Sequence, residues 1–213
     1  GWENALDGFG QTLAILEHGI VPKRHPCCAS THKCLDAVLD LRREHGFTAD
    51  QGDSVHTVVG SSNKRNLSYD DPQNDREAKF SMQYCLALGL VQDHLRIADF
   101  APEAVSRPEL RALIPRITMD AFPVERERAG ETPPDHEVTV RLKDGTVFET
   151  TRAHPRGTIH DPFDAADRAA KYADCIAGKL DDNDSAALAD VLTRFEAVND
   201  LDEVMRFLRF DLG

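Results

Sequence analysis

The spacing of hydrophobic and polar residues predicts several helices in the first two thirds of the chain. In residues 30–45 apolar residues recur every three or four positions, which predicts a helix, and Gly46 fits the cap at its C-terminal end. Residues 82–91 are apolar on nearly all sides, so a helix there would be buried on most of its faces. Short helical turns are expected in residues 102–113, whereas residues 12–21 are expected to be extended and largely buried.

Strict alternation of apolar and polar residues predicts strands between these helices. The clearest pattern lies in residues 137–151, where two alternating segments flank Asp144 and Gly145, and Asp-Gly is the preferred centre of a two-residue hairpin turn. The polar residues 61–75 show no period and are expected to be a long loop. Further strands are predicted in residues 54–60 and 116–122. This mixture predicts an α+β fold, in which a small antiparallel or mixed sheet carries helices on one face.

From Pro162 onward the pattern becomes purely helical. Two apolar stripes recur at helical spacing, and a third short helix is expected to begin at Asp200, with Glu203 as its capping partner. Helices this short are not stable alone, so their apolar stripes need a partner surface. We therefore expect one domain in residues 1–160 and a separate helical segment in residues 161–213.

Composition narrows the class of protein. The chain has 213 residues, 41% of them hydrophobic, and its net charge of −12 argues against nucleic acid or an anionic membrane as the main partner. No apolar run approaches the length of a membrane span. Five irregularly spaced cysteines fit reduced thiols, and hence a cytoplasmic protein, better than a disulfide framework. The chain begins abruptly at Gly1, so we expect it to be a piece of something longer.

The candidate chemistry lies in a positive cluster near the start of the first helix. Residues 18–35 contain no Asp or Glu, although 37 of the 213 residues are acidic. The cluster consists of Lys23, Arg24, His25, His32 and Lys33. A helix N-terminus nearby adds a partial positive charge and free backbone N–H groups, which favour an oxygen anion. The cluster predicts a site for a small, carboxylate-rich molecule, and a solvated basic turn is the alternative.

Cysteines in the same stretch leave two further interpretations open. A metal site would use Cys27, Cys28, His32 and Cys34, but adjacent cysteines are not the usual spacing of structural zinc, so we expect no metal. A thiol at a helix start beside Lys and His would have a lowered pKa and could act as a nucleophile, although free cysteines are more often small buried hydrophobes. Tyr84, in the buried helix, is a second-tier candidate because a buried phenol seeks a polar partner.

Three motifs in order carry a resemblance to a known family. They are VPKRHPCCASTHKCLDAVLDL, REAKFSMQYCLALGLV and VRLKDGTVFETTRAHPRGTIHDPFDAADRAAKY. Together they resemble the MmgE/PrpD family, and the resemblance covers nearly the whole chain. It implies that residues 1–160 are an α+β lid domain, and that residues 161–213 return to a large helical body that this chain lacks.

The resemblance also implies an activity. Family members dehydrate 2-methylcitrate, decarboxylate cis-aconitate or epimerise iminodisuccinate, without a redox cofactor, and many are dimers. We therefore expect a small polycarboxylate substrate, no cofactor and a homodimer in the full-length protein. Because the family's other acid and base residues lie on the helical body, this chain alone is expected to be inactive. The alternative is a non-catalytic module that binds a carboxylate ligand or a partner protein.

The motifs assign roles to individual residues. Lys23 matches the family's lysine, which would hold a substrate carboxylate or stabilise the negative charge that develops beside it. Tyr84 matches a tyrosine near the substrate, and Cys28 stands where decarboxylases have a proton-donating histidine, which favours dehydratase or epimerase chemistry here. Arg24 and His25 of the positive cluster are expected to bind substrate, together with His32, which matches the family's Thr-His element.

Overall fold

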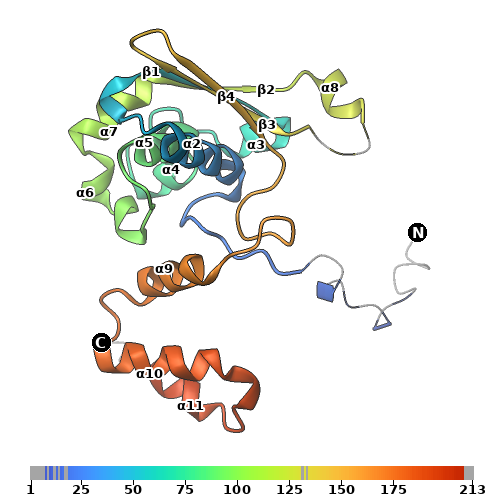
Figure 1. Cartoon of the computed structure of the whole chain (residues 1–213), viewed down its shortest axis with the longest axis vertical. Helices are drawn as coiled ribbons and strands as arrows, with labels where there is room; N and C mark the ends of the chain where they lie inside the picture. Colours follow the sequence, from blue (N-terminus) through green and yellow to red (C-terminus); the bar gives the residue numbers. More distant parts are fainter. Residues whose placement is uncertain are drawn as a thin grey trace. The chain divides into compact units, whose positions relative to one another are not determined.

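The computed structural model describes residues 19–130, 132 and 134–208, together with positions 8, 10, 11, 13, 15 and 16. The chain divides into two compact units, Gly1–Asp164 and Ala165–Gly213, which we call unit 1 and unit 2 (Figure 1). Each unit has its own cluster of buried apolar side chains.

Unit 1 is built on a four-stranded mixed sheet. Its strands are β1 (Gly52–Val59), β2 (Ile117–Ala121), β3 (His136–Leu142) and β4 (Val147–Arg152), and they lie in the order β2-β1-β3-β4. β1 runs parallel to β2 and antiparallel to β3, which in turn pairs antiparallel with β4. The expected strands and the α+β class with a mixed sheet are therefore confirmed.

The hairpin between β3 and β4 is confirmed, but its turn is one residue longer than the sequence suggests. Arg141 pairs with Val147, and the N–H of Leu142 donates to the carbonyl of Thr146 at 2.8 Å. The loop thus holds three residues, and Gly145 takes the positive φ of 90° that this loop type requires. Glycine is favoured there because it has no Cβ to clash with the backbone.

Two helices pack against one face of the sheet and form the core with it. α2 (His32–His45) contacts β3 and β4, and α5 (Met82–Val91) contacts β2 and α2 (Figure 1). Every residue of α5 from Met82 to Leu90 is buried, as its apolar sequence predicts. The two helices approach closely at Gly89, where a Cβ would lie 2.7 Å from a methyl carbon of Leu35.

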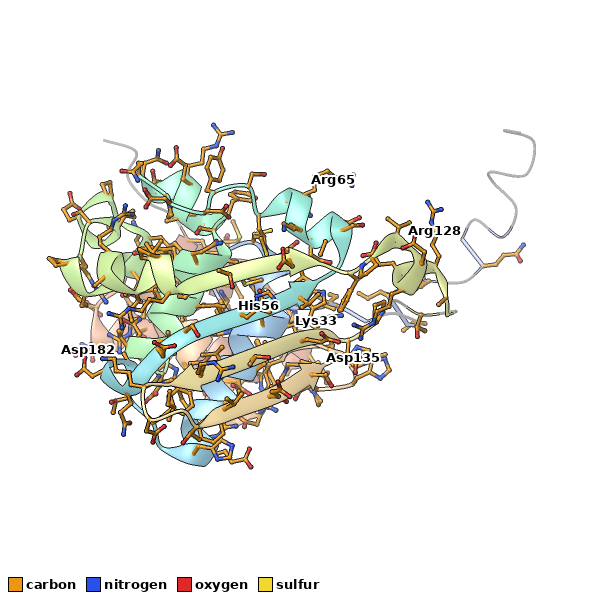
Figure 2. The ribbon with its side chains drawn as sticks, turned by 90° about the horizontal axis from the view of Figure 1, so that it is seen from above. Lys33, His56, Arg65, Arg128, Asp135 and Asp182 are labelled. Carbon is orange, nitrogen blue, oxygen red and sulfur yellow. The ribbon has the colours of Figure 1, made fainter. Side chains whose placement is uncertain are left out.

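The other face of the sheet carries polar side chains. Figure 2 looks onto this face, where His56 on β1 bonds to the hydroxyl of Thr118 on β2 at 2.9 Å. In β1 and β3 the buried residues alternate with more exposed ones, because successive side chains of a strand point to opposite faces. Helices on one face of the sheet are thus confirmed.

Shorter elements complete unit 1 and correct two expectations. They are α3 (Ser61–Asn66), α4 (Asp75–Lys79), α6 (Pro102–Val105), α7 (Pro108–Leu113), α8 (Val124–Arg128) and four 3₁₀ turns. The long loop expected at 61–75 is wrong in its first part, because α3 occupies six of those residues. Residues 12–21 lie partly outside the described residues, and those described there, such as Leu16 and Ile20, are exposed rather than buried.

Unit 2 consists of α9 (Ala165–Ile176), α10 (Asp182–Thr193), α11 (Asp202–Met205) and two 3₁₀ turns. The third helix begins two residues later than expected. Its capping also differs, because Asp200 accepts from the N–H of Asp202 at 2.9 Å, and the Glu203 carboxylate pairs with Arg194. No helix in the described part of the chain has the length and apolar character that crossing a bilayer requires.

Candidate functional site

The candidate site centres on residues 22–28, which we call the Lys23 turn. The prolines at its positions 22 and 26 hold it out of helix, and the N–H of Cys28 anchors its end to the carbonyl of Lys79 at 2.9 Å. Lys23 is exposed, and its ammonium group donates to the carbonyl of Cys27 at 3.3 Å. The turn therefore presents one exposed amine on a backbone that is fixed at its far end.

The next two residues of the turn point inward, to a buried carboxylate on α2. Arg24 Nη1 donates to Oδ1 of Asp36 at 2.8 Å, and His25 Nε2 lies 3.0 Å from the same oxygen. The other oxygen, Oδ2, accepts from the backbone N–H of Arg156 at 2.8 Å, and Arg152 Nε lies 3.9 Å away. The side chain of Asp36 is fully buried, so its charge depends on these partners.

The partners keep Asp36 ionised. Burial by itself raises the pKa of the carboxyl, but the hydrogen bond and charge of His25, the N–H of Arg156 and the charge of Arg24 outweigh it, and the pKa falls to about 2. Burial lowers the pKa of His25, although Asp36 acts in the opposite direction. At neutral pH the imidazole is thus a neutral donor to a negatively charged acceptor.

The segment after β4 packs against the Lys23 turn, and we call residues 152–161 the 152–161 loop. Arg152 forms ion pairs with Asp40 and Asp161, so the start and end of the loop are tied together. Gly157 has a φ of 103°, and a Cβ on it would lie 2.8 Å from the carbonyl oxygen of Pro22. Only glycine fits this contact without displacing its neighbours, since both the backbone angle and the close approach disfavour a side chain.

Beneath the turn lies a buried group of imidazole and thiol side chains. The rings of His25 and His32 meet edge to face at 5.1 Å, and Nε2 of His32 is buried without a hydrogen-bond partner among the residues that the structure describes. Cys27 Sγ lies 3.2 Å from the hydroxyl of Thr31. The pKa of the Cys27 thiol is lowered, because its interactions with Cys85 and with His32 outweigh burial, which acts in the opposite direction. Cys28 is half-buried.

The remaining members of the positive cluster and the cysteine group lie elsewhere. Lys33 is half-buried near Asp135, both of which Figure 2 labels, and burial lowers its pKa. Cys34 contacts Nδ1 of His136 at 3.8 Å, and burial raises its thiol pKa to about 12. Over the ranges that the structure describes, no three His, Cys, Asp or Glu side chains are arranged to hold a metal ion.

Tyr84 is completely buried and makes a different set of contacts. Its hydroxyl donates to the carbonyl of Asp99 at 2.6 Å, and its ring packs against Phe100. Burial raises the pKa of the phenol to about 12, so it remains protonated at neutral pH. The structure thus brings Arg24, His25 and His32 together, while the role of Tyr84 beside a substrate stays a prediction.

Comparison with known proteins decides the family. A model of the MmgE/PrpD C-terminal domain matches residues 25–196. This chain belongs to the MmgE/PrpD family. It is also 23% identical over 197 residues to the cis-aconitate decarboxylase of Mus musculus, an alignment that covers 88% of this chain and 39% of that relative. The chain therefore spans well under half the length of the curated relative that it matches.

The family assignment confirms the resemblance seen in the three motifs, including its restriction to the C-terminal portion. Lys23 stands just before the first matched residue, so its role rests on the motif and on the geometry of the turn. Sequence reasoning missed Asp36, the residue on which this MmgE/PrpD site converges. A signal was present, since Asp36 is the first acid after residues 18–35 and lies among apolar residues of a helix, where a carboxylate needs partners.

Proposed function

We propose that the chain is the C-terminal part of a cofactor-independent lyase or isomerase that acts on small di- or tricarboxylates. Family membership supports the reaction class, and the relative named cis-aconitate decarboxylase supports a polycarboxylate substrate. The observation that carries the proposal is the exposed ammonium group of Lys23 on a turn whose next two residues are anchored to buried Asp36.

The chemistry follows from where charge develops. When a bond beside a carboxylate breaks, negative charge spreads onto that carboxylate, and a fixed ammonium group stabilises the charge most if it is already in place. Lys23 would supply this group, and Arg24, His25 and His32 would complete the environment of the substrate from below. The base that takes the proton would lie on a helical body outside this chain, so we propose that the isolated chain is inactive.

Cys28 bears on the type of reaction. By the family resemblance it stands where decarboxylases have a proton-donating histidine, so the imidazole that would donate the proton is replaced by a cysteine at this position. This favours dehydration or epimerisation over decarboxylation. The same resemblance supports a homodimeric, cytoplasmic full-length protein in which residues 1–160 form a lid domain.

A substrate screen of the full-length protein tests the proposal. We expect turnover of 2-methylcitrate or iminodisuccinate in preference to cis-aconitate. NMR spectroscopy of the products measures the turnover. The variant Lys23→Ala should lose most of the activity with little change in melting temperature. Lys143→Ala, which removes the same charge from the exposed hairpin loop, is the matched control and should behave as the unsubstituted protein.

Two results would contradict the proposal. Full activity of Lys23→Ala would remove the amine from the mechanism. Tight binding of a tricarboxylate by the full-length protein without turnover of any of the three compounds would favour a non-catalytic binding module instead.

A further inference from the structure

We propose that Asp36 is a positioning residue that fixes Lys23 by tying both the Lys23 turn and the 152–161 loop to α2. This inference rests on the proposed function, in which the Lys23 amine binds a substrate carboxylate. The observation behind it is that three donors from two parts of the chain, the Lys23 turn and the 152–161 loop, converge on a single buried carboxylate.

The first part of the argument concerns the turn itself. The two residues that follow Lys23 both bond to Oδ1 of Asp36, Arg24 at 2.8 Å and His25 at 3.0 Å. Because two consecutive side chains share one acceptor, a large rotation of the backbone between them would break one of these bonds. The proline before Lys23 has a fixed φ and the proline after His25 restricts that residue, which removes further freedom. The direction in which Lys23 leaves the backbone is thereby set relative to α2.

The second part concerns the 152–161 loop, which supports the turn from behind. Asp36 Oδ2 accepts from the N–H of Arg156 at 2.8 Å. The next residue, Gly157, lies against the carbonyl of Pro22, the residue directly before Lys23. The same carboxylate therefore holds the residues after Lys23 and, through the loop, the residue before it.

An aspartate is required here, since both of its oxygens accept. An asparagine of the same shape would turn an NH₂ group either toward the N–H of Arg156 or toward the donors of Arg24 and His25. One of the two supports would then be lost. The half-buried guanidinium of Arg24 would also lose the negative charge that balances it.

Positioning of this kind affects rate more than it affects folding. A displacement of about 1 Å of a group that acts in the transition state can lower the rate about 100-fold. Lys23 is exposed and is bonded within the turn to the carbonyl of Cys27, so its place depends on the backbone of the turn.

The first experiment compares two aspartates of α2 in the full-length protein. Asp36→Asn should lower kcat about 100-fold. Asp40→Asn, one helical turn further on, breaks ion pairs with Arg43 and with Arg152 at the start of the 152–161 loop but leaves every bond to Asp36 in place, so it should lower kcat far less, by about threefold.

A double-mutant cycle separates positioning from a merely structural role. If Asp36 acts through Lys23, then Asp36→Asn should cause no further loss of the residual turnover of Lys23→Ala. A structural role would lower the turnover by the same factor in both backgrounds, and that result would overturn the proposal.

A second pair of variants approaches the turn from the loop. Gly157→Ala and Gly145→Ala both place a Cβ on a residue with positive φ, 103° and 90° respectively, but only the first Cβ meets other atoms, the carbonyl oxygen of Pro22 and a ring carbon of Phe163, each at 2.8 Å. Gly157→Ala should lower kcat about tenfold, by a partial displacement of the turn, and Gly145→Ala should leave it unchanged. This pair serves as the test if Asp36→Asn does not fold or if Lys23→Ala has no measurable turnover. Equal kcat values for Gly157→Ala and Gly145→Ala would then overturn the proposal.

The two proposals fail in different ways. Full activity of Lys23→Ala would end the proposed function. Loss of activity in Lys23→Ala with full activity of Asp36→Asn would leave that function standing and end the positioning role.

Discussion

The two units of the chain differ in how completely they bury their apolar side chains. Unit 1 has a continuous core that joins α2, α5 and the sheet, with residues such as Leu35 and Leu86 fully inaccessible. Among the described residues of unit 2, the buried cluster consists of Leu188, Val191 and Phe207. Large apolar residues stay in solvent in both units, among them Ile20 at 71% exposure in unit 1, and Phe195 at 50% and Leu201 at 65% in unit 2.

The difference teaches that one chain can combine a domain with a large core and a helical segment with a small one. A small buried cluster beside exposed large apolar residues is typical of helices that another part of a protein covers. This supports our proposal that unit 2 belongs with a helical body, and it locates the Lys23 turn in the unit with the complete core.

The largest expected effect is on the core of unit 1. Leu35→Ala should destabilise unit 1 by about 3 kcal/mol, because it opens a cavity between α2 and α5 that the rigid packing cannot close. Leu188→Ala should leave unit 1 unchanged and destabilise unit 2 by less, since the buried cluster around Leu188 is small and its rim is partly exposed. Amide hydrogen exchange, read separately for the two units, checks this. A loss of protection in unit 1 on Leu188→Ala would show that the units share one core.

Low pH should destabilise unit 1 more than unit 2, by nearly as much as the Leu35→Ala substitution does. All nine histidines precede residue 161. Burial, with a smaller contribution from the charge of Lys33, lowers the pKa of His136 from 6.5 to about 4. Between pH 6.5 and 4 His136 is therefore protonated in the unfolded chain but neutral in folded unit 1. The free energy of unfolding of unit 1 is highest above pH 6.5 and falls as the pH approaches 4.

The loss that comes from His136 should reach about 3 kcal/mol at pH 4. Urea unfolding at pH 7.5 and 4.5 measures it, and His136→Gln, which removes the titrating group, should reduce the difference between the two pH values. An equal difference in the variant would assign the acid sensitivity to other groups. Unit 2, which has no histidine, should keep its hydrogen-exchange protection over the same range.

Removing one helix N-cap should lower the stability of its own unit by a similar amount in unit 1 and in unit 2. Ser81 accepts from the N–H of Tyr84 at the start of α5, and Asp181 accepts from the N–H of Asp184 at the start of α10. Replacing either residue by Ala should cost about 1 kcal/mol in its own unit. A thermal melt that follows each unit by NMR measures both, and an effect of Asp181→Ala on unit 1 would contradict independent folding.

The smallest effect is expected at Phe195. Phe195→Ser removes a half-exposed ring, so the stability of the 213-residue chain should change by less than about 0.5 kcal/mol. In the full-length protein the same change should cost clearly more, since we propose that the helical body covers this ring. Equal effects in the two proteins would show that Phe195 faces solvent in both.

Sequence patterns predicted the parts of the fold that repeat, and missed those that depend on tertiary contacts. The strands, the buried helix at 82–91 and the cap at Gly46 follow from periodicity and from one backbone angle. α3 has no apolar stripe, and its place depends on contacts such as the ion pair of Lys64 with Asp120, which no local pattern records.

The candidate site shows the same limit. The positive cluster is visible in the sequence, and the structure places Arg24 and His25 on one carboxylate and His25 beside His32. That carboxylate belongs to Asp36, 11 residues after His25, and its other oxygen is bonded by Arg156, 120 residues further along the chain. Only the fold brings these residues together. Whether a residue faces substrate or a buried carboxylate is decided by this geometry and not by residue type.

The central claim is that the exposed amine of Lys23, held by a rigid turn, binds a carboxylate of the substrate. Calorimetric titration of the full-length protein with a non-reactive tricarboxylate tests it most directly, with Lys23→Met compared with the unsubstituted protein. An ion pair partly shielded from water is worth about 1.5–3 kcal/mol, so the variant should bind at least about tenfold more weakly. Equal affinity of the two proteins would contradict the account.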